Sequence, residues 1–120
     1  MEPAGPRSRA LWRVRDGSTF AALRNSRRRG RSGPLWIVWA PAPAGEPPRL
    51  AFAIGRRVGG AVTRNRLRRQ LRAAFWELTP GPGAYLVSVA PEVVALSFGE
   101  LKALVWEALH ALGPARVSPR

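Results

Sequence analysis

The chain has 120 residues and a formal net charge of +13, from 20 Lys and Arg against 7 Asp and Glu. That length suits one domain with a modest core, and so much positive charge favours a polyanionic partner. There is no cysteine, which excludes a disulfide framework and a thiolate metal site.

The positive charge is concentrated in the first 72 residues. They hold seventeen arginines against three acidic residues, whereas residues 73–120 hold three cations against four glutamates. The N-terminal part is therefore expected to meet a polyanion. No long apolar span, lipidation motif or signal peptide is evident. We therefore expect a cytoplasmic protein without a membrane partner.

The first predicted elements are short. Residues 1–15 mix Pro, Gly and Arg, which predicts a basic flexible arm. An Asp-Gly-Ser sequence at 16–18 supplies helix-capping chemistry, so a short helix is predicted over 19–25. Residues 26–33 are predicted to form a basic loop.

Two strands follow. β-branched and aromatic residues predict strands over 35–39 and 50–55, separated by a proline-rich turn. The second strand has large apolar residues on one face, Leu50, Phe52 and Ile54, and small residues on the other. The small face is flat enough to accept a close neighbour.

The second half of the chain alternates helix, strand and helix. An amphipathic helix is predicted over 61–78 and a strand over 85–89. A capping box formed by Ser97 and Glu100 begins the last helix, and Gly113 stops it. The order of elements predicts an α/β (α+β) two-layer sandwich with one sheet, in a single domain over 16–113 followed by a tail at 114–120.

The helix over 61–78 carries the feature that decides the function. One side is apolar, and the opposite side carries Asn65 and a run of arginines spaced mostly three or four residues apart. Such like charges repel one another, and a face that is merely solvated usually interleaves glutamate. Guanidinium groups match phosphate oxygens two at a time, so this face is predicted to bind RNA or DNA.

A diglycine precedes this helix. Gly59 and Gly60 have two explanations, a close approach of the backbone to a ligand or an ordinary strand-to-helix turn. Arg56 and Arg57 lie just before them and are expected to continue the basic ridge. Four arginines between 27 and 31 form a second cluster, which indicates less specific phosphate affinity.

Aromatic residues leave alternatives open. Phe20 either stacks on an unpaired base or packs into the core. Trp36 and Trp39 face opposite sides of their strand, so only one of them can be core.

The residues needed for catalysis are scattered. The chain has one histidine, His110, and its seven acidic residues are dispersed. No nucleophilic triad can be assembled, and a metal-dependent nuclease needs clustered carboxylates. The chain is therefore predicted to bind nucleic acid without itself catalysing a reaction.

Residues 54–72, with the sequence IGRRVGGAVTRNRLRRQLR, resemble the signature of the protein subunit of bacterial ribonuclease P. The shared pattern is a basic pair, a glycine, an Ala-Val pair and an Arg-Asn-Arg motif that opens a basic helix. The likeness runs from about residue 18 to residue 112. It includes the phenylalanine of the first helix and the Ser-Phe-Xaa-Glu-Leu start of the last.

The resemblance implies a mixed sheet with a left-handed crossover, in a ribosomal-protein-S5-domain-2-like fold. It also implies binding to a catalytic RNA subunit, predicted 1:1, and to the single-stranded 5′ leader of precursor tRNA, which assists endonucleolytic removal of the leader. Mg²⁺ is then expected on the RNA subunit and the substrate, with no metal-binding or catalytic side chain on the protein. The residues expected to face the catalytic RNA are Arg64, Asn65, Arg66, Arg68, Arg69 and Arg72, and those expected to contact the leader are Phe20, Arg24, Arg56 and Arg57.

The sequence departs from the family pattern at Arg24, where a second aromatic residue is common one helical turn after Phe20. Guanidinium stacking or a phosphate contact is the expected replacement. Two other functions remain open. A ribosomal-protein-like structural RNA binder would not prefer precursor over mature tRNA, and a stand-alone nuclease would cleave without RNA.

Overall fold

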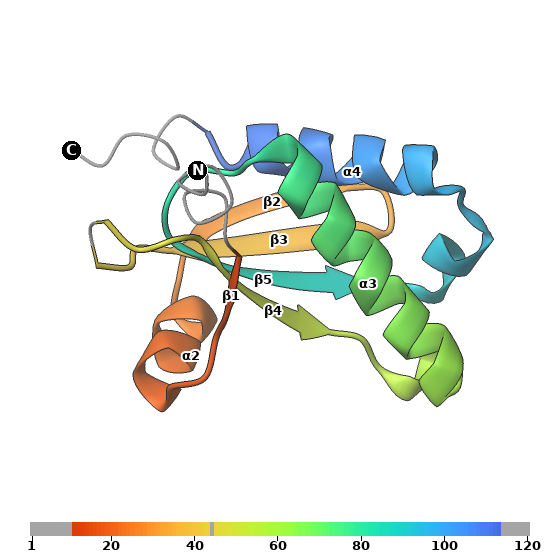
Figure 1. The fold of residues 1–120 in the computed structure, drawn as a ribbon, viewed down its shortest axis with the longest axis horizontal. Helices are drawn as coiled ribbons and strands as arrows, with labels where there is room; N and C mark the ends of the chain where they lie inside the picture. Colours follow the sequence, from red (N-terminus) through yellow and green to blue (C-terminus); the bar gives the residue numbers. More distant parts are fainter. Residues whose placement is uncertain (1–10, 44, 114–120) are drawn as a thin grey trace, which may run out of the picture.

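A computed structural model describes residues 11–43 and 45–113; most of the predicted arm and the predicted tail lie outside the described residues. One five-stranded sheet has the order β1-β4-β5-β3-β2 (Figure 1). The strands are β1 (Trp12–Arg13), β2 (Arg28–Ser32), β3 (Leu35–Ala40), β4 (Arg49–Ala53) and β5 (Ala84–Val89). The helices are α2 (Gly17–Arg24), α3 (Ala61–Leu78) and α4 (Phe98–Ala111), with short 3-10 turns η1 (Arg56–Val58) and η2 (Pro91–Ala95).

The sheet is mixed. β4 runs parallel to both β1 and β5, whereas β3 is antiparallel to β5 and to β2. The chain leaves β4, passes through α3 and returns as the adjacent β5. With the strands of Figure 1 turned to point upward and α3 toward the viewer, β5 lies to the left of β4, so the crossover is left-handed. About 98% of such connections are right-handed, which makes this crossover a distinctive mark of the fold.

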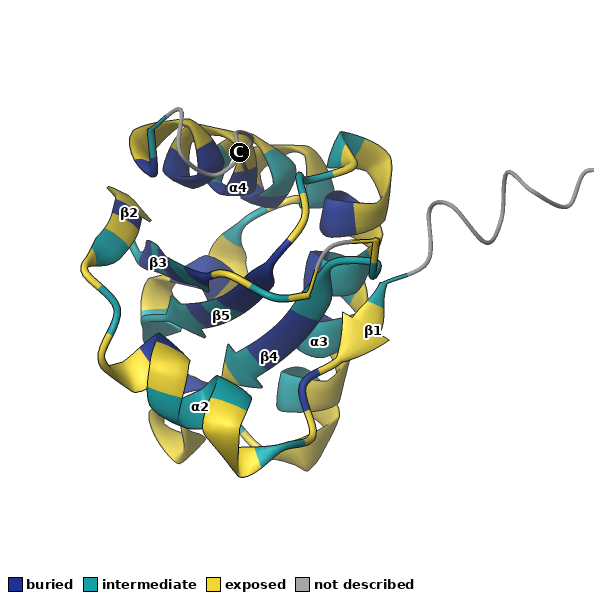
Figure 2. Cartoon of the chain, turned by 90° about the vertical axis from the view of Figure 1, so that its left-hand side faces the viewer, coloured by how far each residue is buried: buried dark blue, intermediate teal, exposed yellow. Residues whose placement is uncertain are grey.

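The two faces of the sheet are covered unequally (Figure 2). The main core lies between the sheet and α3 with α4, where Leu35, Leu50 and Tyr85 of the strands meet Phe75 and Val105 of the helices. A smaller cluster lies on the opposite face, under α2, and it contains Leu23, Val38, Ala40, Ala51 and Ala84. Of the small residues predicted for that side of β4, Ala51 lies in this cluster and so accepts a close neighbour, whereas Ala53 and Gly55 are exposed.

Two strands were not expected from the sequence. β1 lies within the predicted arm, where the Trp12 N–H donates to the Pro48 carbonyl over 2.8 Å and the Val14 N–H donates to the Leu50 carbonyl over 3.0 Å. The prediction that the flexible arm extends to residue 15 is therefore wrong for residues 12–14. A two-residue strand is too short to show a period, and its pairing partner is distant in sequence.

The basic segment predicted as a loop is instead β2, which forms a hairpin with β3. The segment has no β-branched or aromatic residue and contains a glycine, so its strand propensity is low, but alternate residues are buried and Gly30 lies against α4. Tertiary packing outweighs the local preference here.

Replacing Gly30 by alanine is expected to lower the free energy of unfolding by about 3 kcal/mol. A Cβ at position 30 would lie 2.1 Å from the Ala108 carbonyl oxygen and 3.2 Å from the Ala111 Cβ, so β2 and α4 would have to separate. Chemical denaturation measures the effect. Gly17→Ala is the matched control, because its Cβ would meet nothing within 4 Å, and equal stability of the two variants would contradict the close packing of α4 on β2.

Candidate nucleic-acid interface

The long helix α3 separates the core from the basic surface. Its residues Leu67, Leu71, Ala74 and Phe75 are buried, as expected from the apolar stripe. In residues 11–43 and 45–113 the ion pairs join Arg49 to acidic neighbours and Lys102 to Glu77. The arginines of α3 thus have no carboxylate partner in that part of the chain, and their charge is available to a phosphate.

The turn into α3 explains one of the two glycines. Gly59 has a φ of +156°, and a Cβ there would lie 2.9 Å from the Thr63 side chain. The turn itself therefore requires glycine at this position. Gly60 caps the helix without a side-chain hydrogen bond, and a Cβ there would meet nothing within 4 Å.

Arg72 is held against the strands. Its Nη1 donates to the Leu11 carbonyl over 3.2 Å, and its guanidinium carbon lies 5.7 Å from the centroid of the Phe52 ring. Burial, and then the charge of Arg13, lower the pKa of Arg72 from its ordinary value. Two guanidinium groups close enough to repel each other are a favourable environment for an anion.

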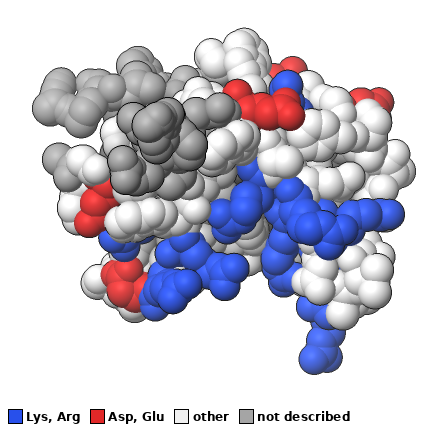
Figure 3. All heavy atoms as spheres, in the orientation of Figure 1, with Lys and Arg blue, Asp and Glu red and all other residues white. Residues whose placement is uncertain are grey.

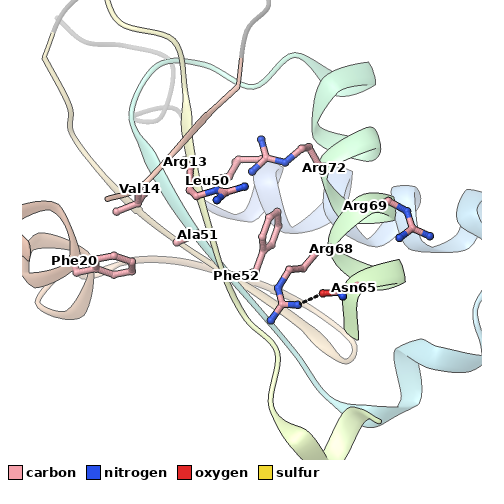
Figure 4. Close-up of a pocket in the computed structure, with 10 residues that line it drawn as sticks. All are labelled: Arg13, Val14, Phe20, Leu50, Ala51, Phe52, Asn65, Arg68, Arg69 and Arg72. Carbon is pink, nitrogen blue, oxygen red and sulfur yellow. Dashed lines mark hydrogen bonds between the residues drawn. The ribbon is translucent and has the colours of Figure 1, made fainter. Parts of the chain in front are cut away.

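A groove of about 590 Å³ lies between α2 and α3 (Figure 4). Phe20 stands on its α2 side, and Asn65, Arg68, Arg69 and Arg72 stand on its α3 side. Its floor and remaining wall come from the strands, through Arg13, Val14, Leu50, Ala51 and Phe52. The groove therefore combines an aromatic ring, an apolar floor and guanidinium groups, a combination that is typical of proteins that bind single-stranded nucleic acid.

The groove follows an open edge of the sheet. β1 pairs only with Arg49 and Leu50 of β4, so among the described residues the following part of β4 has a neighbouring strand on the β5 side alone. The interrupted edge leaves room for an extended ligand.

Arg68 is oriented before any ligand arrives, because its Nη1 donates to the Asn65 side-chain oxygen over 2.8 Å. The space-filling view shows Lys and Arg atoms gathered in a band over this side of the molecule, with acidic atoms at its borders (Figure 3). The groove lies within a broader basic surface, which favours the approach of a polyanion.

The capping residue of α2 fixes the position of Phe20. Asp16 accepts hydrogen bonds from the Thr19 N–H over 2.9 Å and from the hydroxyls of Ser18 and Thr19. These donors hold the pKa of the Asp16 carboxyl well below its ordinary value. The helix that carries Phe20 is thus anchored where the sequence predicted its cap.

The stability contributed by Asp16 is expected to depend on pH. A carboxyl whose pKa is depressed by folding stabilises the folded state above its unfolded pKa of about 3.9 and loses that contribution as the pH falls. In thermal unfolding between pH 7 and pH 2.5, the melting temperature of the parent should exceed that of Asp16→Asn at neutral pH. The two melting temperatures should approach each other as the pH falls. A difference that stays constant with pH would contradict this origin of the stability.

The groove unites residues from both predicted sets. Phe20, predicted for the leader, faces residues predicted for the catalytic RNA, which are Asn65, Arg68, Arg69 and Arg72. The other predicted residues do not line the groove: Arg64 and Arg66 lie nearer the start of α3, Arg56 and Arg57 lie in η1, and Arg24 ends α2. Their contacts with RNA stay predictions.

The second basic cluster has structural partners within the protein. Arg28 Nη2 donates to the Leu112 carbonyl over 2.5 Å at the end of α4. Arg31 donates to the Gly33 carbonyl and lies 4.9 Å from the centroid of the Trp36 ring. Trp39, on the other face of β3, packs against the main core, so the two tryptophans divide as expected.

Sequence reasoning missed Arg13, which lines the groove from β1. The only sequence signal was its membership of the basic N-terminal region. In the described ranges, no group of three His, Asp or Glu side chains is placed to hold a metal. No helix in these ranges is long and apolar enough to span a bilayer.

Fold and groove together define an α+β domain with a groove lined by arginines and an aromatic ring. The family model described as ribonuclease P matches residues 9–113. Among relatives, the ribonuclease P protein component of Roseiflexus sp. (strain RS-1) is 32% identical over 111 residues, covering 89% of this chain and 90% of the relative. That of Beutenbergia cavernae is 40% identical over 90 residues, covering 71% and 75%.

Solved structures agree with this fold. The RNase P protein of Staphylococcus aureus superimposes with a TM-score of 0.72 at 14% identity, covering 82% of this chain and 93% of that one. The RNase P protein from Thermotoga maritima gives a TM-score of 0.70 at 17% identity, covering 81% and 94%. The chain belongs to the ribonuclease P protein family.

Proposed function

We propose that this chain is the protein component of a cytoplasmic ribonuclease P, assembled 1:1 with a catalytic RNA that removes the 5′ leader of precursor tRNA. The protein assists this reaction as an accessory subunit. The observation that carries the proposal is the groove in which Phe20 faces arginines of α3, set in a chain that belongs to the ribonuclease P protein family.

The groove suits the leader because the leader is single-stranded. Its bases can stack on Phe20, and its phosphates can meet the guanidinium groups of Arg68 and Arg72. In the Arg-Asn-Arg turn of α3, Asn65 lines the groove, whereas Arg64 and Arg66 extend the basic surface beyond it, where the catalytic RNA would bind. Arg56 and Arg57 add positive charge at the same end of α3, and Arg24 adds it at the end of α2.

Mg²⁺ is expected to be bound by the RNA and not by the protein. Hydrolysis of a phosphodiester by metal-activated water needs ions held by oxygen ligands, and RNA phosphates supply them in the catalytic subunit and the substrate. The protein's contribution is to neutralise phosphates where two RNAs approach, which lowers their repulsion and the Mg²⁺ concentration that cleavage needs.

Cleavage of a 5′-extended precursor tRNA at low Mg²⁺ tests the proposal. The catalytic RNA alone, the protein alone and the mixture are compared, and efficient cleavage at the mature 5′ end is expected in the mixture only. Arg64→Ala/Arg66→Ala is expected to lose the enhancement. Lys102→Ala is the control that removes one positive charge away from the groove, where Lys102 pairs with Glu77, and this variant should enhance cleavage as the parent does.

The outcomes separate the alternatives. Equal enhancement by the parent and by Arg64→Ala/Arg66→Ala would contradict the role of the Arg-Asn-Arg turn. Absence of any enhancement would favour a ribosomal-protein-like structural RNA binder. Cleavage by the protein alone would indicate a nuclease.

A further inference from the structure

A second hollow, of about 500 Å³, adjoins the groove at β1. It is lined by Leu11, Trp12, Arg13, Arg15, Arg49 and Arg72. Arg13 and Arg72 belong to both hollows, whereas Trp12, Arg15 and Arg49 belong to the second alone. The lining contains four arginines, an indole and no carboxylate.

Trp12 is the apolar element of this hollow. It is 44% exposed, although it belongs to a strand, and an indole in water loses the stabilisation that burial would give it. The Arg49 guanidinium carbon lies 5.5 Å from the centroid of the Trp12 ring. The two residues are register partners across β1 and β4, so the sheet itself sets this arrangement.

Arg49 is fixed from behind. Its Nη1 donates to Asp16 Oδ1 over 3.2 Å, and its Nη2 donates to Glu46. Its Nε is buried and has no hydrogen-bond partner among the described residues. Because the two carboxylates hold Arg49 and Arg49 lies over the indole, the ring is preorganised and little entropy is lost when a ligand stacks on it.

Positive charge in the hollow comes mainly from the other three arginines. Arg49 is offset by its two carboxylates, but no carboxylate pairs with Arg13, Arg15 or Arg72 in residues 11–43 and 45–113. Arg72 uses one N–H on the Leu11 carbonyl and has further donors. An anion between Arg13 and Arg72 would relieve their mutual repulsion.

We propose that this hollow binds one unpaired nucleotide of RNA, with its base stacked on Trp12 and its phosphate held by Arg15 and the Arg13–Arg72 pair. The site deepens the proposed function and rests on it, because it assumes that RNA already occupies the groove beside it. Two RNAs offer an unpaired nucleotide, the leader of the precursor beyond the groove and the catalytic RNA subunit.

Binding measurements with the full chain test the site. Affinity is measured for a precursor tRNA with a long leader, for one with a one-nucleotide leader, and for the catalytic RNA alone. Trp12→Ala is expected to weaken binding about 10-fold, the loss typical of one stacked base, and Trp12→Phe should keep most of the affinity. Trp106→Ala is the matched control, since Trp106 is 49% exposed on α4 and does not line either hollow.

Arg15→Gln provides a second variant that does not disturb the strand. Arg15 is exposed, so the fold should persist. Its loss should weaken binding about 3-fold and reduce the log–log salt slope by roughly 0.7, as expected for one phosphate contact on a single strand. Circular dichroism checks that each variant is folded.

The binding results show whether the second hollow binds a nucleotide and which RNA supplies it. A loss confined to the long leader assigns the nucleotide to the precursor, and a loss with the catalytic RNA alone assigns it to that subunit. If Trp12→Ala and Arg15→Gln bind all three RNAs like the parent while Arg68→Gln does not, the second site is overturned and the proposed function stands. If Arg68→Gln is also without effect, the second site and the role of the groove in RNA binding are both overturned, whereas the assignment to ribonuclease P is tested separately by the cleavage experiment.

Discussion

A variant carrying Arg68→Gln and Arg69→Gln is expected to bind precursor tRNA about 100-fold more weakly than the parent. Both side chains line the groove, and a hydrogen bond to a charged group contributes about 1.5–3 kcal/mol. The log–log dependence of affinity on salt should become shallower by roughly 1.4, because each phosphate contact on a single strand adds about 0.7. Filter binding over a range of salt concentrations measures both effects.

The same variant should be as stable as the parent, or more stable. Arg68 repels Arg64 and Arg72 from four residues away, and Arg69 repels Arg66 and Arg72 from three, so glutamine removes unfavourable pairs from α3. The hydrogen bond from Arg68 to Asn65 is exposed, and its loss costs little. Affinity and stability are therefore expected to move in opposite directions, which is the behaviour of residues kept for binding.

Arg28→Gln is the matched control, with the reverse pattern. Arg28 donates to the carbonyl of Leu112, the C-cap residue of α4, and lies 5.8 Å from the centroid of the Trp39 ring. Its loss should reduce stability by about 1–2 kcal/mol and leave RNA affinity within about 3-fold of the parent. If Arg28→Gln weakened RNA binding as much as the α3 variant, the interface would have to include the β2–β3 hairpin.

Local signals in the sequence predicted the elements that local physics determines. The predicted and observed bounds of α3 agree, because the apolar period and the glycines and prolines at its ends are read within one segment. The capping box is confirmed, with the Ser97 N–H donating to Glu100 Oε1 over 2.9 Å and the Glu100 N–H donating to Ser97 Oγ over 3.1 Å. The parallel pair with its crossover came only from the family resemblance.

Contacts between residues far apart in the sequence explain why β1 and the composition of the groove could not be predicted. β1 depends on hydrogen bonds to residues more than thirty positions away, so nothing near Arg13 reveals that it lines the groove. Arg72 has the spacing of an outward residue, yet it is half-buried, and its guanidinium contacts the Leu11 carbonyl before β1 and the Phe52 ring of β4. The sequence thus predicted the kind of surface, whereas the fold decides which arginines share one groove.

Phe20→Ala is expected to abolish most of the preference for precursor over mature tRNA. Phe20 is half-buried against the cluster under α2 and also lines the groove, so core packing and exposure to ligand coexist in one ring. Loss of one stacked base should weaken precursor binding about 10-fold and leave mature tRNA unaffected. Phe20→Leu retains apolar contact and removes the aromatic face, so a similar loss in both variants would assign the effect to stacking.

The salt dependence separates Phe20 from its neighbour on α2. A stacked base releases no counterion, so the log–log slope for Phe20→Leu should equal that of the parent even though affinity falls. Arg24 lies one turn further along α2 and is exposed; Arg24→Gln should reduce the slope by roughly 0.7 with a loss of about 3-fold if it contacts a leader phosphate. If Arg24→Gln leaves both the slope and the affinity unchanged, leader recognition from α2 rests on Phe20 and the guanidinium does not replace the second aromatic residue of the family. A lower affinity with an unchanged slope would instead indicate that the Arg24 guanidinium stacks on a base.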